Sequence, residues 1–130
     1  MRRCKIVSTL LFLIITTMGG VQAAGELSGN QRIESDHLGY VLQYRVYTPK
    51  GIDALSDIPT IYMTDGQWYI DSGKMVKELD KQIARGTIKP VVAVFVDNRD
   101  PDNLYNNRRN QQFFCNTDYV NFFTRELVPT

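Results

Sequence analysis

A short apolar run that ends in an aspartate–glycine pair constrains the fold of this chain more than any other feature. The run from Ile58 to Thr64 is rich in apolar and β-branched residues, and it stops at Asp65-Gly66. The residues that follow have the amphipathic spacing of a helix. This order is typical of a buried strand that enters a tight turn and then a crossover helix. In α/β sheets, ligands bind at the carboxyl end of such a strand, and the amides of the turn point toward them.

The first 23 residues have the layout of a secretory signal peptide. A basic start precedes an unbroken apolar segment from Leu10 to Ile15, and small residues near Ala23 suit a signal peptidase. The alternative is an uncleaved membrane anchor, but the apolar segment is shorter than the roughly 20 residues that span a bilayer. We therefore expect cleavage after residues 1–23, export to the periplasm or else to the extracellular space, and no membrane attachment afterwards.

The mature chain has nearly balanced charge. Without the signal peptide it keeps 12 Lys and Arg against 14 Asp and Glu, a net charge of −2. No basic stripe remains, which argues against a nucleic-acid partner. One cysteine, Cys115, also remains, and we expect it to be buried and inert or paired with a cysteine elsewhere.

The residues before the central run predict two antiparallel strands. Residues 24–30 are small and polar and are expected to form a mobile leader, followed by a short strand over 32–37. Residues 40–47 alternate between two faces with β-branched and aromatic side chains, which predicts a strand paired antiparallel to the one before. Residues 24–39 are thus a leader and first strand.

The residues after the central run predict a βαβ unit. Asp71-Ser72 offers a helix cap, and apolar residues recur at helical spacing from Met75 to Ile83. Gly86 is placed to end this helix. Residues 91–96 are apolar on both faces, as a parallel strand covered by helices must be. The crossover between the two parallel strands is expected to be right-handed.

The last third of the chain is expected to be a long loop and a helix. Residues 97–112 are rich in Asn, Asp and Arg, and a loop of this length inside a domain is more often functional than idle. Asn116 then caps a final helix with an apolar side, and Pro129 would end it.

Several kinds of catalytic site are missing from the sequence. It has no G-x-S-x-G nucleophile elbow, no glycine-rich phosphate loop and no clustered metal ligands, so no metal and no cofactor are expected. Its single histidine, His37, lies beside a predicted turn and is expected to be a surface or edge residue.

The D-G-Q turn remains as the candidate site. Gly66 lets the backbone turn tightly and approach a ligand closely, and the amide of Gln67 is free because it precedes the helix proper. Such a donor suits a developing oxyanion and can lower a barrier by about 3 kcal/mol. The alternative is an ordinary turn in which Asp65 caps the helix and Trp68 covers the core.

Four segments then occur in an order that carries a family resemblance: IYMTDGQWY, LDKQIARGTIKP, VVAVFVDNRD and FFTRELVP. Together they resemble the putative-esterase family of α/β-hydrolases, which includes enterochelin-type siderophore esterases, esterase D and feruloyl esterases. The similarity covers about Tyr40 to Pro129. It implies an α/β fold in which antiparallel first strands lead into parallel βαβ strands with flanking helices. Residues 40–130 would then be the N-terminal half of a hydrolase domain, ending before the nucleophile strand.

The resemblance also implies a reaction. The amide of Gln67 would form half of an oxyanion hole, with Gly66 enabling the turn. The serine, acid and histidine of the triad would lie in sequence after Thr130, so no triad residue is assigned here. The parent enzyme would hydrolyse a small-molecule, glycan or siderophore ester through an acyl-serine intermediate, and the chain as written would be inactive.

Substrate contacts are open to two interpretations. Arg108 and Arg109 could meet an anionic or polyhydroxyl substrate, or form ion pairs in a solvated loop with Asp97, Asp100 or Asp102. Trp68 and Tyr69 could line a substrate pocket or cover the core. A rival to the enzyme is a non-catalytic secreted binding module that uses the Asn/Arg-rich loop for a glycan or protein surface.

Overall fold

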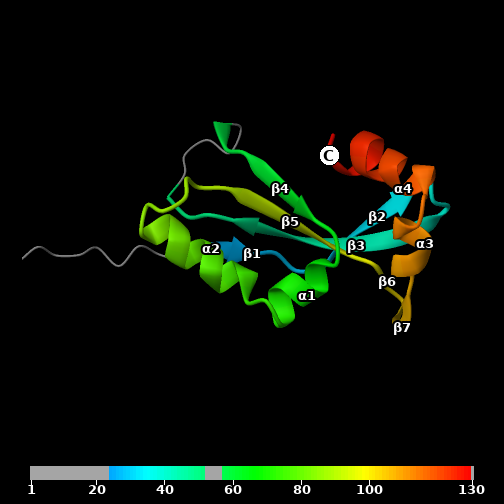
Figure 1. Cartoon of the computed structure of the whole chain (residues 1–130), viewed down its shortest axis with the longest axis horizontal. Coiled ribbons are helices and arrows are strands. Elements are labelled where there is room, and N and C mark those ends of the chain that lie inside the picture. Colours follow the sequence, from blue (N-terminus) through cyan, green and yellow to red (C-terminus); the bar gives the residue numbers. More distant parts are fainter. Residues whose placement is uncertain (1–23, 52–56, 130) are drawn as a thin grey trace, which may run out of the picture.

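A five-stranded mixed sheet forms the centre of the molecule (Figure 1). The structure is a computed structural model that describes residues 24–51 and 57–129, so the expected signal peptide lies outside the described residues. The strands of the sheet are β1 (Glu26–Leu27), β2 (Gln31–Ser35), β3 (Tyr40–Thr48), β4 (Thr60–Met63) and β5 (Val92–Asp97).

The two predicted antiparallel strands are confirmed. β2 pairs antiparallel with β3, with Ile33 opposite Leu42 in the register. The expectation of a mobile leader is wrong for β1, which pairs with the far end of β3. The cause is local: the N–H of Ser28 donates to the carbonyl of Val46 at 2.8 Å, and the N–H of Val46 donates to the Ser28 hydroxyl at 2.9 Å.

The predicted βαβ unit is also confirmed. β4 and β5 are parallel, and β5 pairs antiparallel with β3 on its other side. The order along the sheet is β1-β3-β5-β4, so β4 is the edge strand of the described sheet. Its Ile61 side chain is correspondingly exposed.

The crossover consists of two helices, α1 (Gly66–Asp71) and α2 (Met75–Ala84). The expected cap at Asp71-Ser72 is wrong, because these two residues end α1 and the N-cap of α2 is Lys74. α2 then begins after Lys74, which has the left-handed φ of 48°. Its end matches the sequence pattern, since Gly86 has a positive φ of 68° just after the helix.

Alternating side chains of β5 bind the two helical layers to the sheet. Val94 and Val96 face the C-terminal helices, while Ala93 and Phe95 face α2. Figure 1 shows α1 and α2 on one side of the sheet and α4 on the other. The two buried clusters are Leu42, Val94, Val96, Tyr119, Phe122 and Leu127 on one face, and Tyr47, Leu79, Val91, Ala93 and Phe95 on the other.

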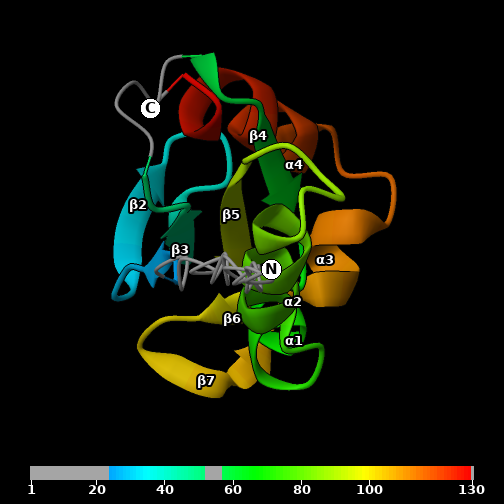
Figure 2. The same ribbon diagram turned by 90° about the vertical axis from the view of Figure 1, so that its left-hand side faces the viewer.

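The expected long loop is wrong, because residues 97–112 fold into a hairpin and a short helix. The hairpin is β6 (Arg99–Asp100) and β7 (Asn103–Asn107), and it stands away from the main sheet (Figure 2). The helix that follows is α3 (Arg109–Phe113). A side chain stabilises each end of the hairpin, since Arg99 pairs with Asp97 and Arg108 with Asp100.

The final helix begins as predicted. The side chain of Asn116 accepts a 3.1 Å hydrogen bond from the N–H of Tyr119 and so caps α4 (Thr117–Asn121). α4 runs on into a π-helical segment, η2 (Phe122–Leu127), which ends before Pro129.

Candidate active site

The turn after β4 is held by a side chain from the neighbouring strand. The N–H of Asp65 donates a 2.6 Å hydrogen bond to Oδ1 of Asn98, the residue that follows β5. Asp65 itself has a left-handed φ of 57°. Its side chain makes no capping hydrogen bond to α1 and instead accepts from Nε of Arg109 at 2.8 Å. The alternative in which Asp65 caps the helix is therefore wrong.

Gly66 is required by close packing rather than by its own φ. A Cβ built on Gly66 would lie 2.5 Å from the carbonyl carbon of Phe95 and 2.7 Å from its Cα. Backbone atoms of β5 cannot move aside as the end of a flexible side chain can. The residue with a positive φ in this turn is Asp65, not Gly66. A glycine is needed at position 66 because only a residue without a Cβ lets α1 lie this close to β5.

The amide of Gln67 is not used by the fold. The first backbone bond of the turn runs from the N–H of Trp68 to the carbonyl of Asp65, at 2.9 Å. Within the part of the chain that the structure describes, the N–H of Gln67 donates to no acceptor. Such an amide, at the carboxyl end of a parallel strand, is available to a ligand. Its role in an oxyanion hole stays a prediction.

A buried polar network extends from Asn98. Its side chain is fully buried, and its Nδ2 donates to Oε1 of Gln112 at 2.5 Å. Gln112, also buried, donates from Nε2 to the hydroxyl of Tyr40 at 3.3 Å. Tyr119 lies 3.4 Å from Asn98 Nδ2, and burial raises the pKa of its hydroxyl, which stays protonated. Strand β3 and helices α3 and α4 therefore all support the turn.

Sequence reasoning missed Asn98 and Gln112. Both lie in the polar stretch that the sequence predicts to be a loop, where no periodicity marks a buried residue. One signal was present: Asn98 follows the apolar strand at 92–97 much as Asp65 follows its own strand. The carboxyl ends of adjacent parallel strands meet at one edge of a sheet.

Trp68 and Tyr69 do not cover the core. Trp68 is 57% exposed and Tyr69 is 42% exposed, on the outer side of α1. The alternative of core cover is therefore wrong, and the substrate role of Trp68 stays a prediction. An open groove of about 630 Å³ lies beside Thr64 and is lined by Gln112, Phe113, Cys115, Asn116, Thr117, Tyr119 and Val120.

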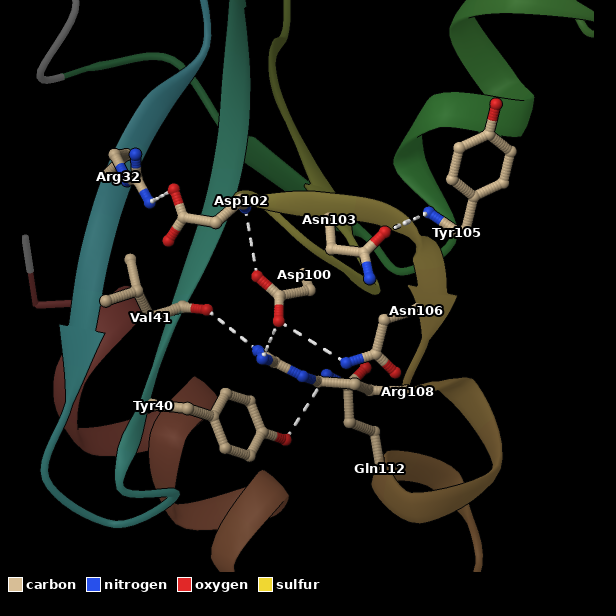
Figure 3. Close-up of polar contacts among 10 residues, drawn as sticks. All are labelled: Arg32, Tyr40, Val41, Asp100, Asp102, Asn103, Tyr105, Asn106, Arg108 and Gln112. Carbon is tan, nitrogen blue, oxygen red and sulfur yellow. Dashed lines mark hydrogen bonds and ion pairs between the residues drawn. The ribbon is translucent and has the colours of Figure 1, made fainter.

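Arg108 is fixed within the fold (Figure 3). Its guanidinium pairs with Asp100, donates from Nη1 to the carbonyl of Val41 at 3.1 Å, and lies 4.3 Å from the ring centroid of Tyr40. Only 15% of its side chain is exposed. The ion pair with Asp100 is one of those that the sequence suggests as an alternative, and substrate binding by Arg108 stays a prediction.

Arg109 differs from its neighbour in exposure and position. Its side chain is 52% exposed and pairs with Asp65 at the turn itself. It also lies over the ring of Phe113, 5.1 Å from the centroid. Of the two arginines, Arg109 is therefore the one that reaches the candidate site.

The remaining reactive residues are His37 and Cys115. His37 is in the connection between β2 and β3, where its N–H donates to Glu126. Cys115 is exposed with a free thiol, so the expectation of burial is wrong. Over the described ranges, 24–51 and 57–129, His, Cys, Asp and Glu form no group suited to a metal, and no helix has the length and apolarity needed to cross a membrane.

Several solved structures with a similar fold are esterases or other hydrolases. The enterobactin esterase FES from Shigella flexneri, solved with enterobactin, superposes with a TM-score of 0.69 at 22% identity, over 83% of this chain and 26% of its own. An IroE-like serine hydrolase from Shewanella oneidensis has a TM-score of 0.58 at 21% identity, over 80% of this chain and 37% of its own. A ferulic acid esterase superposes with a TM-score of 0.58 at 16% identity, over 82% of this chain and 41% of its own. No curated protein sequence matches the chain.

These likenesses confirm the α/β-hydrolase fold that the sequence predicts. They also show that the chain spans about a quarter of the length of the enterobactin esterases it matches. The profile of the family described as Putative esterase matches residues 35–130, which is most of the chain. This protein therefore belongs to the Putative esterase family.

Proposed function

We propose that this chain is the N-terminal part of an exported serine esterase that hydrolyses a carboxylic ester through an acyl-enzyme. Membership of an esterase family supports hydrolysis as the reaction class. The signal-like residues 1–23 support export, with the periplasm as the preferred compartment.

The observation that carries the proposal is the unused N–H of Gln67. It lies at the carboxyl end of β4, where Asn98 holds the preceding turn and Gly66 packs on β5. A rigid donor in this position can stabilise the charge that develops on an ester carbonyl oxygen, because it needs no reorganisation during the reaction. Removing one such donor typically costs about 3 kcal/mol of barrier stabilisation.

The nucleophile is proposed to be encoded outside these 130 residues. The sequence contains no G-x-S-x-G segment, and its single histidine lies in the connection between β2 and β3, where its N–H donates to Glu126. β4 is the edge strand of the described sheet, so a further strand has a place beside it. Serine, acid and histidine would all come from that further sequence, and the chain alone would be inactive.

The proposed substrate is a small-molecule, glycan or siderophore ester. Support comes from the solved relatives, which include FES with enterobactin and with 2,3-dihydroxy-N-benzoyl-serine. The open groove beside Thr64 lies at the same end of the sheet as the turn and has room for an acyl or alcohol group. Acyl transfer to serine needs no metal or organic cofactor.

The test is a comparison of this chain with a version extended through its coding sequence. A serine elbow is expected within about 30 residues after Thr130. The extended protein should hydrolyse p-nitrophenyl acetate, the 130-residue chain should not, and substitution of the elbow serine by alanine should abolish turnover. A stop codon at that point, or an extended protein that does not turn over the ester, would favour the non-catalytic binding module. Activity that survives the serine substitution would exclude the acyl-serine mechanism.

A further inference from the structure

A second hollow lies on the face of the sheet that carries α1, between that helix, β3 and the β6–β7 hairpin. It has a volume of about 150 Å³. Polar groups from four elements reach it, together with the apolar side chains of Ile70, Phe95 and Leu104. The polar residues used below are Gln43, Arg45, Gln67, Asp71, Asp97 and Arg99.

The side chain of Gln67 is the unusual member of this lining. The residue is only 8% exposed, yet neither Oε1 nor Nε2 of its amide has a hydrogen-bond partner among the described residues. Buried amides are nearly always paired, because an unpaired one loses its bonds to water without replacement. Both atoms are covered, so a ligand would meet them after the side chain turns toward the hollow. This rotation of the side chain would give Oε1 and Nε2 of Gln67 the hydrogen-bond partners that they lack.

The charged groups of the hollow are already balanced. Asp97 accepts from Nε2 of Gln43 at 3.0 Å and from Nη2 of Arg99 at 2.7 Å. Arg45 donates from Nε to the carbonyl of Ser28 at 2.8 Å, and Asp71 supplies a second carboxylate. Two arginines and two aspartates leave no net charge to attract an ion. A neutral ligand suits this lining best.

Size and polarity together define the ligand. A cavity of about 150 Å³ holds one six-membered ring. The Gln67 amide offers one donor and one acceptor side by side, which a hydroxyl group can satisfy at both atoms. We propose that this hollow binds a single neutral, hydroxyl-bearing six-membered ring of the pyranose type, with the Gln67 side chain as the anchoring contact. The proposal uses the side chain of Gln67 and does not depend on ester hydrolysis by its backbone amide.

The test is a titration of the ¹⁵N-labelled protein with methyl β-D-glucopyranoside, followed by NMR. The side-chain NH₂ signal of Gln67 and the backbone signals of Arg99 and Leu104 should shift together along one binding curve. Gln67→Leu should weaken the apparent Kd at least tenfold, whereas Gln31→Leu, at an exposed glutamine of β2, should leave it unchanged. Leu104→Trp narrows the mouth from an exposed position of β7 and should also weaken binding, so the test does not depend on one variant folding.

Three outcomes would overturn the proposal. The first is a titration in which the pyranoside shifts no signal of the lining residues. The second is equal binding of the pyranoside to wild type and to Gln67→Leu. The third is tighter binding of sodium glucuronate or phenol than of the pyranoside, which would mean an anion site or an apolar ring site. Loss of esterase activity in an extended protein would bear on none of these readouts, so the two proposals fail separately.

Discussion

Oδ1 of Asn98 accepts a 2.6 Å hydrogen bond from the N–H of Asp65, and this bond joins the carboxyl ends of β5 and β4. Asn98 is fully buried and Asp65 is half-buried, so the acceptor of this bond is shielded from water. It fixes Asp65 in its left-handed conformation and thereby sets the direction of the next two amides. Geometry at the candidate site thus depends on a side chain from the adjacent strand.

Asn98→Ala should loosen the turn. The substitution leaves the N–H of Asp65 and Oε1 of Gln112 without their partner, and each buried unpaired group costs about 1–3 kcal/mol. Urea unfolding should show a free energy of unfolding lower by at least that amount, and hydrogen exchange of the Asp65 amide should accelerate. Asn110→Ala, at an exposed position of α3, is the control and should change stability by less than about 0.5 kcal/mol. Equal effects of the two variants would mean that Asn98 does not hold the turn.

Gly66→Ala should be strongly destabilising. Its Cβ would meet backbone atoms of Phe95 at 2.5 Å, which forces α1 away from β5. Overpacking of this kind typically costs about 1–3 kcal/mol. Gly29→Ala is a matched control, because nothing lies within 4 Å of the position that a Cβ would take there. Thermal unfolding should separate the two variants, and a Gly66→Ala protein with an unchanged Tm would show that α1 does not pack so closely.

Arg108→Ala should lower the Tm more than Arg109→Ala. Arg108 is 15% exposed and joins Asp100, Val41 and the ring of Tyr40, whereas the side chain of Arg109 is 52% exposed. An exposed pair contributes only about 0–1 kcal/mol, so loss of Arg109 should be nearly neutral for stability. Should the order of the two Tm values be reversed, Arg108 would not be part of the structural framework that Figure 3 shows.

Glu126 should make stability depend on pH. Partial burial pushes the pKa of its carboxyl up, but hydrogen bonds from the Ser35 hydroxyl and the His37 N–H lower it more, so the pKa lies below its ordinary value. The stabilisation is therefore present above the ordinary carboxyl pKa and is lost as the pH falls through the folded-state value.

The measurement is the urea midpoint of wild type and Glu126→Gln at pH 7 and at pH 3. The variant should be less stable at pH 7, and the gap should be smaller at pH 3. Glu34→Gln, at an exposed position of β2, should show no such gap at either pH. A gap for Glu126→Gln that widens on acidification would contradict the sign of the pKa shift.

The central strands of this fold could be predicted because their sequences have a regular hydrophobic pattern. β3 and β5 carry continuous period-two or fully apolar patterns, and they form the middle of the sheet. The division into α1 and α2 could not be predicted, because Asp71-Ser72 is a good capping sequence and the actual break uses a left-handed Lys74. Tertiary packing of Gly66 on β5 decides where the first helix begins.

The candidate site could be predicted in part. The D-G-Q turn is recognisable because it ends a strand pattern. The residues that hold it are not, since Asn98 and Gln112 acquire their partners only when β5, α3 and β3 come together. The β6–β7 hairpin escapes prediction for the same reason: its ends are fixed by ion pairs between polar residues, and these leave no periodic pattern.

The central claim is that the N–H of Gln67 stabilises an oxyanion, and replacing that N–H tests it most directly. In the extended protein with its serine elbow, Gln67→Pro removes the N–H at a first-turn position where proline is tolerated, while Gln67→Ala keeps it. We predict that kcat for p-nitrophenyl acetate falls about 10²- to 10³-fold in Gln67→Pro relative to Gln67→Ala, with both proteins folded by circular dichroism. Equal kcat values in the two folded variants would contradict the claim.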